Sequence, residues 1–330
     1  MKKRNKFLLA SAILIAAVLI YFIFIGSRDI ALERAASSQV GGTSGPNNGA
    51  TISQSKQAFG HAGADTRAAS TERSALTLTQ MAGEQHLASL LNEVRRNPNV
   101  MAQEFAVFAP ARLCLELKVM KSNGIQPLLD VKRDLLATVS LTLKPESETA
   151  TREIAQRCND YGNDGLLVDK LRAELLKAGA PVSAAIAQIP LLDPQAQEAE
   201  LVNVRAPFAA VFAGDDVPVK LQMLGGRVAS WGQRWVTSAV PDAYKPDALL
   251  LAVIALDIAT CRAGATCDGT SIARARLCAR YGECAATDVE ASYRRLHTLY
   301  QVPFEMTEKV VQRYEEAIRT KNPLLVLGNT

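Results

Sequence analysis

The apolar positions of the chain form two distinct patterns, and the first is a single long run near the start. Phe7–Ile25 reads FLLASAILIAAVLIYFIFI, which is 19 residues without a charge. A helix of that length rises about 28 Å, close to the thickness of the hydrocarbon core of a bilayer. The run therefore predicts one transmembrane helix, and we assign residues 1–26 as a transmembrane signal anchor.

The second pattern covers residues 75–330, where apolar residues recur every three or four positions, as on one face of a helix. Strand-like alternation is scarce, although Leu141–Leu143 and Val217–Val219 are β-prone. The pattern predicts an all-α fold, a multi-helix globular body built as one domain or two packed halves. The predicted helices, bounded by Pro, Gly and Asn, cover residues 76–97, 100–108, 111–121, 128–139, 147–158, 166–177, 182–188, 194–204, 248–259, 271–281, 287–300 and 307–321.

One of these predicted helices is almost entirely apolar. Residues 248–259 read ALLLAVIALDIA, a stretch of 12 residues. A helix of that length is too short to cross a bilayer, so the stretch predicts a buried core helix.

Residues 27–74 differ in composition from both patterns. Ser37–Ser74 is rich in Gly, Ser, Thr, Ala and Asn, and includes GGTSGPNNGA at 41–50. Such a segment has too few large apolar side chains to offset the entropy lost on ordering. We therefore expect a flexible linker that holds the body away from the membrane.

The charges around the anchor predict its orientation. Lys2, Lys3, Arg4 and Lys6 precede the apolar run, and only Arg28 follows it closely. Positive residues flanking a span stay in the cytoplasm, so the N-terminus is expected there and the body outside. The short basic start is typical of a bacterial signal anchor. We therefore expect a single-pass protein of the bacterial inner membrane with a periplasmic body.

Cleavage of the anchor is the alternative to its retention. A cleavable signal peptide has a shorter apolar region, followed by small residues at the cut. Here the bulky Tyr21–Ile25 occupies that place, which favours retention, while Ala31, Ala35 and Ala36 keep cleavage open.

Net charge narrows the choice of partners. The chain carries a net charge of +4, and four positive residues precede the anchor, so the remainder sums to zero. A neutral body lacks the positive surface charge that nucleic acid binding requires. The expected partners are therefore the membrane, through the N-terminal helix, and an envelope protein, with no nucleic acid.

The six cysteines predict disulfides, because an even number beyond a membrane span is typical of an oxidising compartment. Cys261–Cys267 and Cys278–Cys284 repeat one pattern, C-x5-C with an internal glycine that can end a helix and turn the chain back. We therefore favour disulfides within each of these two repeats, and the two remaining cysteines, Cys114 and Cys158, are then paired by elimination. Cross-linked pairing, Cys261–Cys284 with Cys267–Cys278, is the alternative. Neither spacing fits a zinc or C-x-x-C redox site, so no metal is expected.

No motif for catalysis or cofactor binding occurs in a fitting context, so we assign no catalytic, cofactor-binding or metal-binding residues and no cofactor. The three histidines, His61, His86 and His297, stand apart and are expected to be surface or half-buried residues. Trp231 and Trp235 lie four residues apart on one helical face. Core packing is the favoured reading of this pair, with partner docking or sugar stacking as the alternative.

Two functions remain open. The first is a membrane-anchored extracytoplasmic protein that binds another protein or serves as a scaffold in the cell envelope, without catalysis. The second is an envelope hydrolase whose two catalytic carboxylates lie far apart in the sequence. A deep cleft with facing carboxylates, one of raised pKa, would favour the hydrolase. An exposed apolar surface without such a cleft would favour the binder.

Overall fold

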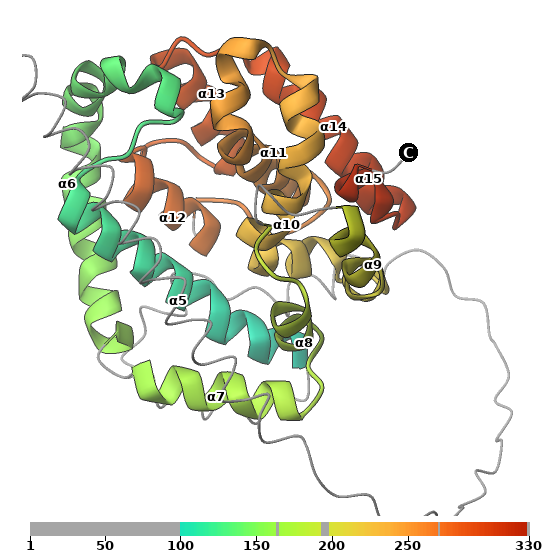
Figure 1. The fold of residues 1–330 in the computed structure, drawn as a ribbon. Coiled ribbons are helices and arrows are strands. Elements are labelled where there is room, and N and C mark those ends of the chain that lie inside the picture. Colours follow the sequence, from blue (N-terminus) through green and yellow to red (C-terminus); the bar gives the residue numbers. More distant parts are fainter. Residues whose placement is uncertain (1–99, 163–164, 193–197, 270, 329–330) are drawn as a thin grey trace, which may run out of the picture. The chain divides into compact units, whose positions relative to one another are not determined.

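The computed structural model describes residues 100–328, apart from 163–164, 193–197 and 270 (Figure 1). Within these residues the regular elements are helices without a strand, which confirms the all-α prediction. They are α5 (Val100–Asn123), the 3-10 helix η1 (Asp130–Leu135), α6 (Leu136–Gly162), α7 (Gly165–Lys177), α8 (Pro181–Gln188), α9 (Glu198–Phe212), α10 (Val217–Ala239), the 3-10 helix η2 (Asp242–Asp247), α11 (Ala248–Arg262), α12 (Ile272–Tyr281), α13 (Val289–Leu299), α14 (Phe304–Thr320) and α15 (Leu324–Leu327).

Three helices run through prolines at which the sequence predicted a break or a new element. Pro110 lies inside α5, Pro145 inside α6 and Pro207 inside α9. An internal proline loses one backbone hydrogen bond and costs about 3 kcal/mol in an isolated helix. Tertiary packing outweighs that cost, since a long helix buries residues on both sides of the proline. The β-prone Leu141–Leu143 lies within α6, so its strand-like composition was misleading.

The sequence prediction differs most from the structure at α10, a helix that was not predicted. Val217–Val219, expected as a possible strand, is the first turn of this helix, and Pro218 occupies an N-terminal position. Proline is well tolerated there because the first helical N–H groups have no partner within the helix. The favoured reading of the tryptophan pair is confirmed, since Trp231 is 0% exposed and Trp235 is 8% exposed. The Trp231 indole N–H donates to the Pro190 carbonyl oxygen at 2.8 Å.

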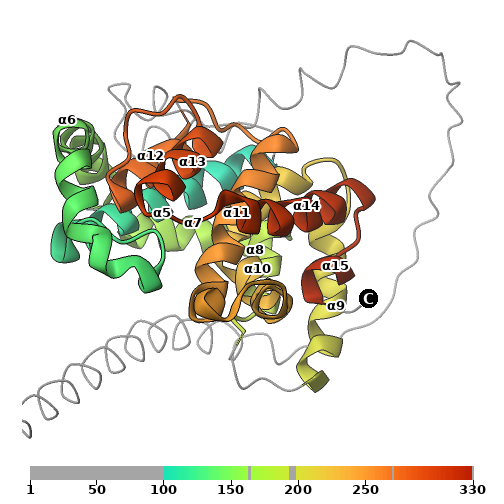
Figure 2. The same ribbon diagram turned by 90° about the horizontal axis from the view of Figure 1, so that it is seen from above.

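The core is built around α11, which packs against α10 and α14 (Figures 1 and 2). Every residue of α11 from Leu251 to Thr260 is buried, so the prediction of a core helix over 248–259 is confirmed. The amphipathic helix α14 packs against both α11 and α10, and it buries Val310, Val311 and Tyr314. Burying aliphatic side chains of this size stabilises a fold by about 1.5–3 kcal/mol each.

A second set of contacts joins α5, α6 and α12. The disulfide Cys114–Cys158 links α5 to α6 with the two Cα atoms 5.4 Å apart. In Figure 1, α12 lies alongside α5, although about 160 residues separate the two helices in the sequence. This pairing brings together side chains that are far apart in the sequence.

The other two disulfides each close the end of a helix. Cys261 pairs with Cys267 and Cys278 with Cys284, so all three pairs are those favoured from the sequence. The internal glycines have the expected positive φ, 102° at Gly264 and 74° at Gly282. In this left-handed region glycine alone is unstrained, which lets the chain reverse beside the last turn of its own helix.

All described residues belong to one compact unit, Gly63–Thr330. Among them no helix is both long enough and apolar enough to span a bilayer. The predicted anchor (1–26), the predicted linker (27–74) and the predicted helix 76–97 lie outside the described residues.

Candidate functional site

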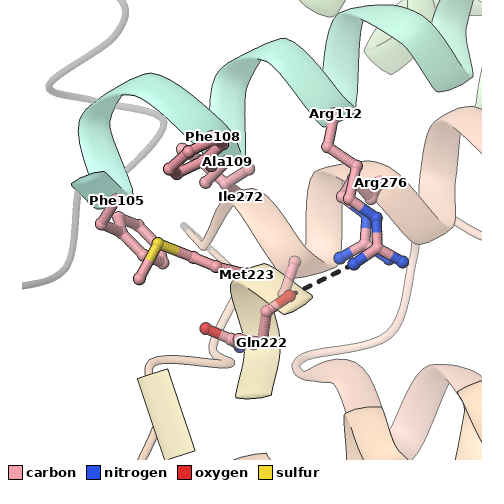
Figure 3. Close-up of a pocket in the computed structure, with 9 residues that line it drawn as sticks. Phe105, Phe108, Ala109, Arg112, Gln222, Met223, Ile272 and Arg276 are labelled. Atoms are coloured by element: carbon pink, nitrogen blue, oxygen red, sulfur yellow. Dashed lines mark hydrogen bonds between the residues drawn. The ribbon is translucent and has the colours of Figure 1, made fainter. Parts of the chain in front are cut away.

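A pocket opens where α5, α10 and α12 meet (Figure 3). The pocket is small: its empty space of about 300 Å³ includes open solvent at the mouth, and the centres of water molecules have access to only about 20 Å³. The pocket is lined by Phe105, Phe108, Ala109, Arg112, Gln222, Met223, Ile272, Ala273 and Arg276. Most of these side chains are apolar, and the two arginine guanidiniums lie together at one end.

Helical spacing explains how α5 and α12 present these side chains. On α5 the contributing residues are 105, 108, 109 and 112, which share one face of the helix. On α12 they are 272, 273 and 276, with the same one-turn relation. Each helix therefore places apolar residues in its earlier turn and an arginine in the following one. Together the two helices give the pocket an apolar end and a cationic end.

Arg112 is held against the backbone of α10. Its Nη1 donates to the Gln222 carbonyl oxygen at 3.2 Å, and its Nε lies 3.4 Å from Glu116 Oε1. The guanidinium fits because residue 225 is glycine: a Cβ there would lie 2.7 Å from Arg112 Nη1. Gly225 therefore makes room for the arginine, a role that sequence alone did not assign to the pair at 225 and 226.

Arg276 extends the charged end of the pocket into the core. Its Nε donates to Glu116 Oε1 at 3.0 Å, and its Nη2 lies 3.7 Å from Asp257 Oδ2. The Tyr293 hydroxyl donates to the same Asp257 oxygen at 2.8 Å. These contacts join α5, α11, α12 and α13 through one buried polar network, which holds the guanidinium in place from behind.

Burial and neighbouring charges shift the pKa values of this network in consistent directions. Burial and then repulsion from Arg276 lower the pKa of Arg112. Burial by itself would raise the pKa of Glu116, but Arg276 and Arg112 together bring it below its usual value. Burial, and next Asp257, raise the pKa of Tyr293, so this phenol stays protonated and donates its hydrogen bond.

Arg112, Arg276 and Arg280 all act electrostatically on Glu116, and Asp257 lies beside Arg276. Removing one partner of such buried charges leaves the others uncompensated, so the carboxylates help to hold the guanidiniums in place.

Glu104 is the described carboxylate closest to the expected properties of a catalytic acid. It is 0% exposed, and its pKa is raised, chiefly by burial. However, its two oxygens accept the backbone N–H groups of Ser183 at 2.6 Å and Val182 at 3.1 Å. These are orphan N–H groups in the first turn of α8, so Glu104 serves as a cap from another helix.

His297 belongs to the core, whereas the sequence suggested a surface or half-buried position. It is 1% exposed, with Nδ1 3.2 Å from the Val302 carbonyl oxygen and Nε2 3.3 Å from Thr307 Oγ1. Burial lowers its pKa to about 4, so the ring is neutral at pH 7. His61 and His86 lie outside the described residues.

Sequence reasoning missed the arginines of the pocket. The signal that was present is Phe-x-x-Phe-Ala-x-x-Arg over 105–112, in which an arginine continues an otherwise apolar helical face. The predicted break at Pro110 concealed it, because it divided that face between two helices. The six cysteines lie apart from this pocket, except that Cys267 Sγ is 3.4 Å from Gln222 Nε2.

Within the described part of the chain, no group of three or more His, Cys, Asp or Glu side chains is placed to hold a metal ion. No family model matches the chain, and no curated protein or solved structure shows significant similarity to it.

Proposed function

We propose that this chain is a membrane-anchored protein of the bacterial cell envelope whose helical periplasmic body binds another envelope protein, as an adaptor or scaffold. The observation that carries the proposal is the pocket between α5, α10 and α12, where apolar walls meet two arginines held in place by a buried network. Rigid arginines beside apolar surface are typical of protein recognition sites.

The properties of the carboxylates favour binding over hydrolysis. Hydrolysis of a glycosidic bond needs two carboxyl groups that face each other across the substrate, one of them with a raised pKa. Glu116, next to the pocket, is paired with arginine and has a lowered pKa. Glu104 has a raised pKa, but both of its oxygens are occupied by backbone N–H groups. The hydrolase alternative therefore has less support.

Membrane anchoring rests on the sequence: the uncharged run Phe7–Ile25 and the positive charges before it. An alkaline phosphatase fused after Ser74 should be active in a bacterial host, because this enzyme folds only where disulfides form. Activity from a reporter that works only in the cytoplasm, fused at the same point, would contradict the proposed topology.

Site-specific photo-crosslinking in intact cells tests the binding function with the full-length chain. A photoreactive residue in place of Met223, on the pocket wall, should give a discrete adduct with one envelope protein. The same residue in place of Val202, which is 66% exposed on α9, serves as the control. Identical adducts from both positions, or none from Met223, would overturn the proposal.

A further inference from the structure

We propose that the disulfide Cys261–Cys267 is a reversible exchange site, opened by a protein dithiol that attacks Cys261, while the other two disulfides stay closed. The chain is the substrate of this reaction and not the oxidoreductase, since its cysteines lack the C-x-x-C spacing of such enzymes. The inference goes beyond the proposed binding function and does not depend on it.

Accessibility separates this disulfide from the other two. Each of the others has one cysteine in the core: Cys158 is 8% exposed and Cys278 is 3% exposed. Cys261 and Cys267 are both only partly buried, and the neighbouring residues 262–264 are exposed. Thiol–disulfide exchange requires access of the attacking thiolate to a sulfur atom. Of the three disulfides, Cys261–Cys267 therefore meets this requirement best.

The surroundings of the two sulfur atoms decide which one leaves. Gln222 Nε2 donates a hydrogen bond to Cys267 Sγ at 3.4 Å. The same donor would stabilise a thiolate on Cys267, because a hydrogen bond to the charged form favours that form. Cys261 lies in the last turn of α11, where the negative end of the helix dipole disfavours a thiolate. Cys267 is therefore the better leaving group, and Cys261 is the sulfur that is attacked.

The exchange proceeds in two balanced steps. A thiolate of the dithiol attacks Cys261 Sγ, a mixed disulfide forms, and the electron pair of the broken S–S bond passes to Cys267 Sγ. The second thiol of the dithiol then loses its proton and attacks its own partner sulfur in the mixed disulfide, which releases Cys261 as a thiolate. The dithiol is oxidised to a disulfide, and the two protons that it loses are taken up by Cys261 and Cys267.

Backbone hydrogen bonds keep the two cysteines close together after the bond opens. Within the loop, the Ala265 N–H donates to the Thr260 carbonyl oxygen at 3.0 Å. The Val289 N–H donates to the Cys267 carbonyl oxygen at 3.0 Å, which fixes that end of the loop to α13. The disulfide closes a loop with a sequence separation of only 6, so its opening costs less stability than opening of a long loop would. The opened site can therefore close again.

The disulfide Cys278–Cys284 is a matched control within the chain. It has the same sequence separation of 6, and it also encloses a glycine with positive φ, Gly282, as Cys261–Cys267 encloses Gly264. Loop length and backbone conformation are therefore shared, and burial of Cys278 distinguishes the control. The proposal requires that a dithiol discriminates between these two disulfides.

Reduction under native conditions tests which disulfide opens. The full-length chain in detergent micelles is incubated with dithiothreitol, and the thiols that appear over time are blocked with N-ethylmaleimide and mapped by mass spectrometry. Cys261–Cys267 should open at a rate at least about tenfold higher than Cys278–Cys284, with no change in circular dichroism. Equal rates for the two disulfides, or opening of Cys261–Cys267 only on unfolding, would overturn the proposal.

A thioredoxin whose second active-site cysteine is replaced by serine tests which sulfur is attacked. It can form the mixed disulfide but cannot resolve it, so the complex can be captured by acid. Peptide mapping should find the thioredoxin linked to Cys261, with Cys267 free. A link to Cys267 would overturn the assignment of the leaving group. A link to any of the other four cysteines, or the absence of a complex, would overturn the exchange site.

Gln222→Leu tests the role of the amide, which makes Gln222 a positioning residue for the leaving sulfur. Loss of its N–H donor should slow the opening of Cys261–Cys267 at least about threefold and leave Cys278–Cys284 unchanged. In the reduced chain, the pH dependence of Cys267 alkylation should shift to higher pH, an effect that altered packing alone does not predict. Gln233→Leu, about three turns further along α10, is the matched control and should change neither property. Equal behaviour of the two variants would contradict the role of the amide.

Discussion

Gly232 provides a quantitative test of how α10 packs against α14. An alanine Cβ at this position would lie 2.1 Å from the Tyr314 hydroxyl oxygen and 3.1 Å from Cζ. Tyr314 is 1% exposed, and its ring contacts that of Trp235 with centroids 5.6 Å apart. The tyrosine therefore cannot move away without displacing a buried tryptophan, so Gly232→Ala must strain the core.

Comparison with Gly226→Ala removes the contribution of helix propensity. Either substitution gains up to about 1 kcal/mol, because alanine is favoured over glycine within a helix. A Cβ at Gly226 meets nothing within 4 Å, so that variant should keep the whole gain. Overpacking of a rigid core costs about 1–3 kcal/mol, so Gly232→Ala should be less stable than Gly226→Ala by that amount. For a body of this size the difference corresponds to roughly 2–12 °C in Tm.

Removal of the tyrosine hydroxyl should relieve the strain. This hydroxyl is buried and has no hydrogen-bond partner among the described residues, so Tyr314→Phe alone should cost little. In the double variant the atom nearest to the new Cβ is gone, and most of the lost stability should return. Thermal unfolding followed by circular dichroism measures all four proteins. Equal Tm values for Gly232→Ala and Gly226→Ala would refute the described contact.

Three other predictions concern the disulfides, the buried histidine and the linker. Removing the Cys114–Cys158 disulfide should lower the free energy of unfolding by about 4 kcal/mol, because it closes a loop with a sequence separation of 44. Removing Cys261–Cys267, with a separation of 6, should lower it by only about 2 kcal/mol. Urea unfolding measures both losses. Peptide mapping without reductant should find the three described pairs, and a link between cysteines on opposite sides of residues 268–275 would contradict them. Burial lowers the pKa of His297 from 6.5 to about 4, so the folded state is fully stable with respect to this group above pH 6.5 and loses about 3 kcal/mol of its free energy of unfolding as the pH falls to 4. His297→Gln should make the midpoint of urea unfolding less dependent on pH over this range. An unchanged pH dependence in the variant would exclude the histidine as its source. A chain that starts at Glu72 should be soluble and helical by circular dichroism, and its aggregation would show that the preceding residues are needed for folding.

Local patterns in the sequence predicted the features that depend on neighbouring residues. Helical periodicity gave the all-α fold and the buried position of 248–259, because one helical face must lie against the core. The two short disulfides were expected for a similar reason: a glycine with positive φ within C-x5-C returns the chain to its own helix end. These features need information from only about one or two turns of chain.

The errors arose where distant packing outweighed a local preference. Proline and β-prone residues weaken a helix by their own properties, yet α5, α6 and α9 continue through Pro110, Pro145 and Pro207. In each of these helices, packing of its own side chains against other helices offsets the free energy lost at the proline. No local signal reports that gain, because it depends on which helices become neighbours.

The candidate site shows the same limit most clearly. Arg276 and Glu116 are 160 positions apart, and Arg112 and Gln222 are 110 apart, yet each pair is in hydrogen-bond contact. The sequence determined that α5 and α12 each carry an arginine after an apolar turn. Only the tertiary structure decided that these two turns meet beside α10, because helix packing, and not chain proximity, brings their side chains into one pocket.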